Sequence, residues 1–97
     1  MCKTEIFAKI LEAVSRVTEV DKEDILSDIR REEVVDARSI LAFLMNENGF
    51  YIGEIAACMK RTRPSIRYLL KCFENRSGMR KMIRINMEEA QKYLLRE

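Results

Sequence analysis

Residues 59–70 read MKRTRPSIRYLL and gather three arginines and one lysine around the only proline of the chain. Arg63, Arg67 and, just beyond, Lys71 recur every four residues, a spacing that places side chains on one face of an α-helix. Guanidinium and ammonium groups in such a row form charge-assisted hydrogen bonds with phosphate oxygens. At about 1.5 Å per residue the row is about 12 Å long, comparable with the width of the B-DNA major groove. The pattern therefore indicates binding to a polyanion.

The charge of the chain is concentrated in this segment. Residues 1–59 carry 7 basic and 12 acidic side chains, for −5; residues 60–76 carry 6 and 1, for +5; residues 77–97 carry 5 and 3, for +2. The alternative is an ordinary solvated surface helix, but such helices mix charges of both signs, whereas Glu74 alone opposes six cations here. A concentrated basic segment attracts polyanions even when the net charge of the protein is small.

The elements around this row have the dimensions of a helix-turn-helix, predicted over about residues 51–75. Apolar spacing predicts a helix near Ile52 to Met59, a connection of about four residues, and a second helix from about Pro64 to Asn75. Proline suits the first turn of a helix, where its missing N–H leaves no bond unmade. The second helix presents a set of apolar residues opposite the cationic row: Ile66, Leu69, Leu70 and Phe73.

These positions predict how the second helix would meet duplex DNA. The N-terminal end of a recognition helix contacts base edges, and residues before it contact phosphates. Arg63 and Ser65, helped by Thr62, are therefore expected to contact bases. The expected phosphate contacts from this region are Lys60, Arg61, Arg67 and Lys71.

The whole chain is predicted to be all-α, a small bundle of five to six helices forming a single domain over residues 1–97. It has only three glycines, no strand-type alternation, and apolar residues recurring every three to four positions. Thr4 is expected to cap the first helix and Asp21 to start a short second one. The third helix is expected over about residues 32–46, with Gly49 as a left-handed cap. After a break at NRSG, residues 75–78, an additional helix is expected over about residues 80–96.

The composition argues against several other classes. Without histidine there is no ready general base near pH 7, and no serine or cysteine lies in a nucleophile motif, so we expect no catalytic residue, cofactor or small-molecule substrate. Cys2, Cys58 and Cys72 form no CxxC pair and are expected to be reduced thiols without metal. No run approaches the roughly 20 apolar residues of a membrane span. A cytoplasmic protein without a membrane partner is expected.

Three motifs resemble the C-terminal DNA-binding domain of DnaA, the bacterial replication initiator, a Trp-repressor-like helix-turn-helix fold. They are ILS before a basic segment, VVDARSILAFL in the third helix, and EIA in the first helix of the predicted pair. The resemblance covers approximately residues 10 to 74. It implies that Arg30 enters the minor groove and that Arg38 and Ser39 contact phosphates. It also implies a role in DNA replication or transcription regulation, with double-stranded DNA as partner. A homodimer through the first or last helix is compatible with DNA binding and with a protein-interaction role, because helix-turn-helix proteins often present two copies at half-site spacing.

The sequence departs from that family at informative positions. Thr62 and Arg63 stand where the family has aspartate and histidine, and Glu32 replaces a basic residue. No GxxxxGK phosphate-binding loop is present, so a free-standing relative without the initiator's ATPase is expected, such as a repressor or a mobile-element accessory protein. The altered motif and the methionines of the last helix leave an alternative open: a helical protein-interaction module that has lost DNA binding.

Overall fold

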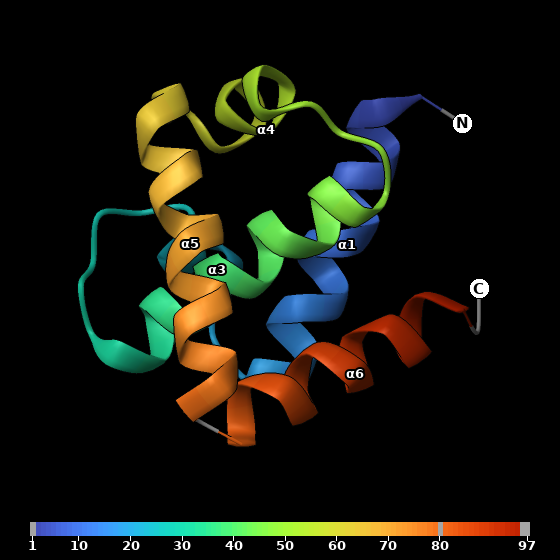
Figure 1. Cartoon of the computed structure of the whole chain (residues 1–97). Coiled ribbons are helices and arrows are strands. Elements are labelled where there is room, and N and C mark those ends of the chain that lie inside the picture. Colours follow the sequence, from blue (N-terminus) through green and yellow to red (C-terminus); the bar gives the residue numbers. More distant parts are fainter. Residues whose placement is uncertain (1, 80, 96–97) are drawn as a thin grey trace.

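Six helices follow one another in the computed structural model, which describes residues 2–79 and 81–95, without the side chains of residues 76–79 (Figure 1). Their bounds are α1 Lys3–Thr18, α2 Lys22–Ile25, α3 Glu32–Glu47, α4 Ile52–Met59, α5 Arg63–Met79 and α6 Lys81–Leu95. No strand occurs in the described part of the chain. The prediction of a small all-α bundle is confirmed.

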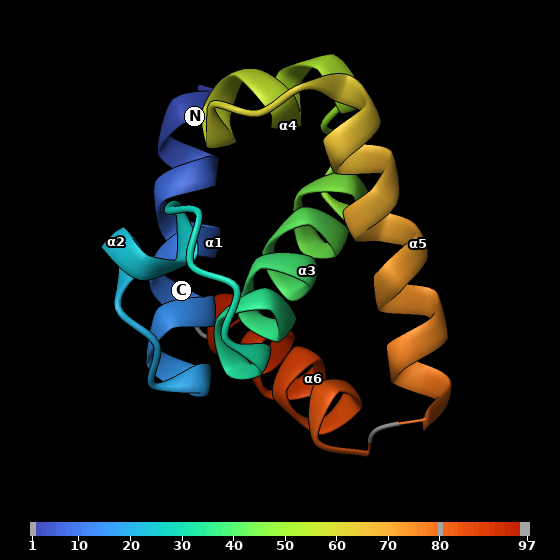
Figure 2. The ribbon, with the colours of Figure 1, turned by 90° about the vertical axis from the view of Figure 1, so that its left-hand side faces the viewer.

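Helix α3 is the centre of the bundle, and every other helix packs against it (Figure 2). Its buried residues lie all around the helix, as expected for a helix covered on every side. Gly49 adopts φ 86° directly after α3, and the N–H of Phe50 donates to the carbonyl of Met45 at 3.1 Å. The predicted left-handed glycine thus ends α3, because glycine has no Cβ to oppose this conformation.

Two predicted helix boundaries were wrong. Thr4 lies inside α1, because the extended backbone of Cys2 takes the N-cap position and its carbonyl accepts from the N–H groups of Glu5 and Ile6. The NRSG segment does not end the helix; α5 continues through it to Met79. A single internal glycine costs a helix only about 1 kcal/mol relative to alanine, which continued backbone hydrogen bonding offsets. Arg80, predicted to start the last helix, lies outside the described residues.

Helix α5 is anchored to the bundle by the apolar face that the sequence predicted. Ile66, Leu69 and Phe73 are buried, and Leu70 is partly buried against the core. Phe73 stacks on Phe43 of α3, with ring centroids 4.2 Å apart and 22° between the planes. Stacked rings add about 0.5 to 1.5 kcal/mol beyond the burial of their surface. One face of α5 is therefore fixed, and the opposite face is left for other contacts.

Candidate nucleic-acid interface

Helices α4 and α5 are joined by residues 60–62, one residue fewer than predicted, and α4 lies across the N-terminal end of α5 (Figure 2). Lys60 makes the turn in the left-handed conformation, with φ 55° and ψ 48°. The N–H of Arg61 then donates to the carbonyl of Ala56 at 2.9 Å, which closes the end of α4. The turn is thus short and held by backbone bonds.

The cationic row lies on the exposed face of α5. Arg63, Arg67 and Lys71 are all exposed, opposite the buried face of the same helix. Among the residues that the structure describes, no carboxylate lies within ion-pairing distance of these three cations. A row of three like charges without a counter-charge repels itself, and a polyanion would relieve that repulsion.

Arg63 does not extend straight into solvent. A Cβ built on Gly53 of α4 would lie 3.0 Å from both Nε and Nη2 of Arg63. The guanidinium therefore rests on the backbone of α4 at the one place where a glycine leaves room for it. Nothing in the sequence signalled this contact, because the two residues are ten positions apart on different helices.

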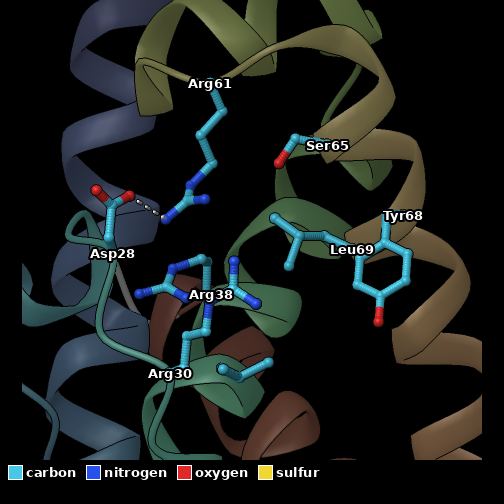
Figure 3. A pocket seen from close by; sticks show the side chains of 8 residues that line it. Asp28, Arg30, Arg38, Arg61, Ser65, Tyr68 and Leu69 are labelled. Carbon is cyan, nitrogen blue, oxygen red and sulfur yellow. Dashed lines mark ion pairs between the residues drawn. The ribbon is translucent and has the colours of Figure 1, made fainter.

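Thr62 and Ser65 do not share the predicted base-reading surface. The hydroxyl of Thr62 accepts a hydrogen bond from the backbone N–H of Ser65 at 3.3 Å, so it caps the start of α5. Ser65 is half-buried and lines a cavity beside α5, with its hydroxyl turned toward that cavity (Figure 3). Of the three residues expected to contact bases, Arg63 alone belongs to the exposed row.

The predicted phosphate contacts of Arg38 and Ser39 need correction. Ser39 is 0% exposed, and its hydroxyl donates to the carbonyl of Val35 at 2.8 Å. Arg38 is 4% exposed, and its Nε and Nη2 donate to three carbonyls: those of Asp24 and Ile25 at the end of α2, and that of Ile29 in the connection to α3. The Ser39 hydroxyl is therefore engaged within α3, and the Arg38 guanidinium supplies donors to carbonyls at the end of α2 and in the connection that follows it.

Arg61 reaches across to the same connection from the α4–α5 turn. Its Nη2 donates to the carbonyl of Ser27 and lies 3.9 Å from a carboxylate oxygen of Asp28. Its Nε is buried and has no hydrogen-bond partner within the described part of the chain. Two arginines from distant parts of the sequence thus hold the connection, which no spacing rule could have predicted.

A cavity of about 630 Å³ opens between the α2–α3 connection, α3 and α5 (Figure 3). Burial lowers the pKa of Arg38, and the nearby charges of Arg61 and Arg30 lower it further, whereas Asp28 raises it. The cavity is therefore electropositive and suited to anions. Its lining residues are Asp28, Arg30, Val35, Arg38, Arg61, Ser65, Tyr68 and Leu69.

The described residues include no group of three histidine, cysteine or acidic side chains that could hold a metal ion. Helices in the described ranges are also too short or too polar to cross a membrane.

Comparison with known proteins gives no relative: no family model matches the sequence, and no curated protein matches it.

Proposed function

We propose that this protein binds double-stranded DNA by placing the exposed face of α5 in the major groove. The observation that carries the proposal is the row of Arg63, Arg67 and Lys71, exposed and without carboxylate partners among the described residues, on a helix whose other face is buried against α3. From Arg63 to Lys71 the row covers eight residue steps, or about 12 Å of helix. The B-DNA major groove is about as wide and admits an α-helix.

The side chains divide into two roles in this proposal. Arg67 and Lys71 are exposed on α5 and contact phosphates on the groove wall, and exposed Lys60 adds a contact at the turn. Arg63 lies nearest the N-terminus of α5 and contacts a base edge, with its guanidinium held by Gly53. The function served would be transcription regulation or DNA replication, in keeping with the resemblance to the DnaA domain.

The salt dependence of duplex binding tests the proposal. Each phosphate contacted contributes a slope of about −0.9 to log K against log salt concentration, so the contacts of Lys60, Arg67 and Lys71 give a slope of about −3. Lys71→Ala should weaken binding to all sequences and make the slope shallower by about 1. Arg63→Ala should instead relax the preference at one base position, at a cost of about 1 to 3 kcal/mol. Fluorescence anisotropy on duplexes selected from a random pool measures both effects.

Arg84→Ala is the matched control, because it removes an exposed arginine from α6, away from the α4–α5 pair. It should leave both the affinity and the slope nearly unchanged. Equal losses from Lys71→Ala and Arg84→Ala would show that net charge, and not the α5 face, attracts DNA. That result would refute the proposal.

A second candidate is a helical module that binds another protein. It is favoured by apolar side chains on the surface of α6, where Met82 is 58% exposed and Ile85 is 39% exposed. Met87, by contrast, packs partly against the core, and the side chain of Met79 lies outside the described part. Absence of duplex binding at low salt, together with self-association that Met82→Ser abolishes in sedimentation analysis, would favour this candidate.

A further inference from the structure

The cavity beside α5 is lined by three arginines, two of which are recessed. Arg38 is 4% exposed and the Arg61 side chain is 18% exposed, whereas Arg30, which contributes from the α2–α3 connection, is exposed (Figure 3). Asp28 is the one acid in the lining, and its side chain extends fully into solvent. Three guanidinium groups against one carboxylate leave the lining with two uncompensated positive charges.

One of these arginines has a hydrogen-bonding group without a partner. Arg61 donates through Nη2 to the carbonyl of Ser27, but its buried Nε has no acceptor among the residues that the structure describes. The carboxylate of Asp28 is 3.9 Å from Nη2, which is too long for a hydrogen bond. Because this Nε is enclosed by the protein, Arg61 offers a ligand its positive charge and the part of its side chain that remains 18% exposed.

The remaining lining is suited to more than an ion. Leu69 is buried and Tyr68 lies on the same wall of the cavity, so an apolar surface faces the arginines. The volume of about 630 Å³ falls within the range of about 300 to 1,000 Å³ that is typical of small-molecule sites. A phosphate ion alone would occupy only part of it.

We propose that this cavity binds a small phosphate monoester, whose phosphoryl group lies between Arg30 and Arg61, with the positive charge of the buried Arg38 behind them, and whose organic part lies against Tyr68 and Leu69. A monoester carries about −1.5 to −2 charges at pH 7, which matches the two excess positive charges of the lining. A phosphodiester of the DNA backbone carries one charge and is attached to a wide, rigid duplex. The recessed position of Arg38 and Arg61 therefore favours the small ligand. The site is independent of DNA binding by α5.

Isothermal titration calorimetry with AMP, glucose 6-phosphate and inorganic phosphate tests the site, with adenosine and glucose as uncharged counterparts. The esters should bind and raise the Tm, whereas adenosine and glucose should not. Arg30→Ala removes one charge-assisted contact and should weaken ester binding by about tenfold or more. The matched control is Arg31→Ala, which removes the neighbouring exposed arginine that does not line the cavity; it should change the affinity by less than about twofold.

Three outcomes would overturn the inference: no binding of any ester at millimolar concentration, equal binding of adenosine and AMP, or equal losses from Arg30→Ala and Arg31→Ala. Duplex titrations with the same variants separate this site from the α5 face. If no ester binds and Arg30→Ala selectively weakens duplex binding, the cavity receives a backbone phosphate, and the proposed function stands without the small ligand. If esters bind as described and no duplex binds, the inference stands and the DNA-binding proposal fails.

Discussion

Replacement of Arg38 by methionine tests whether its guanidinium holds the α2–α3 connection. Nε donates to the carbonyl of Ile25 at 2.8 Å in a buried position, and Nη2 donates to those of Asp24 and Ile29 at 3.2 and 3.0 Å in partly buried positions. Methionine preserves most of the aliphatic packing but offers no donor. Three carbonyls would therefore lose their partner, two of them at places that water can reach.

The magnitude follows from these three bonds. A hydrogen bond to a charged group contributes about 1.5 to 3 kcal/mol, so the buried bond to Ile25 is assigned about 2 kcal/mol. The two bonds that share Nη2 add about 0.5 to 1 kcal/mol each, because water can replace them. Removal of a buried charge that Arg61 and Arg30 repel offsets part of this loss. The net loss in the free energy of unfolding is about 2 to 3 kcal/mol.

Urea denaturation followed by circular dichroism measures this loss. A domain of this size has a total stability of about 5 to 15 kcal/mol, so the variant should remain folded with a clearly lower midpoint. Arg67→Met is the matched control, because Arg67 is exposed on α5 and its replacement should change stability by less than about 0.5 kcal/mol. If Arg38→Met and Arg67→Met have the same midpoint, the guanidinium does not hold the connection and its burial needs another explanation.

Two further predictions concern α4. Gly53→Ala should raise the Tm by about 2 to 6 °C, because alanine favours the helix by about 0.5 to 1 kcal/mol and the mobile end of Arg63 has only to move a few tenths of an ångström; a lower Tm would show that the guanidinium cannot move. The pKa of Glu54 is lowered, first by its hydrogen bond with Lys3 at 2.6 Å and then by the backbone N–H of Tyr51 at 2.8 Å. Ionised Glu54 therefore stabilises the fold above the ordinary glutamate pKa, and this contribution is lost as the pH falls through the lower pKa of the folded state. Between pH 7 and 3, the free energy of unfolding measured in urea should fall less for Glu54→Gln than for the unsubstituted protein. An equal fall in both would contradict this.

The positions of most helices could be read from the sequence because they depend on local preferences. Apolar residues at three- and four-residue spacing predicted the buried side of α5, and Gly49 ended α3 through its left-handed φ. Predictions were less accurate where two neighbouring residues could take the same structural position. Thr4 was a good cap in isolation, but the backbone of Cys2 already received the first hydrogen bonds of α1.

The roles of the arginines could not be read in the same way. Arg38, Arg61 and Arg63 look alike in sequence, yet one is buried on carbonyls, one is half-buried at a cavity, and one rests on a glycine. What separates them is the arrangement of distant elements around each side chain. Tyr68 and Asp28 likewise became cavity residues only because α5 and the α2–α3 connection face each other.

The sequence by itself determined that the chain is helical, that its positive charge is concentrated after residue 59, and that α5 has one apolar and one cationic face. These follow from residue types and helical spacing, which act over a few neighbouring positions. The tertiary structure decided which cations remain exposed and which satisfy buried carbonyls or line a cavity. That outcome depends on burial and on the hydrogen-bond acceptors that distant segments bring near each side chain. A buried carbonyl without a donor destabilises the fold more than the immobilisation of an arginine side chain beside it does.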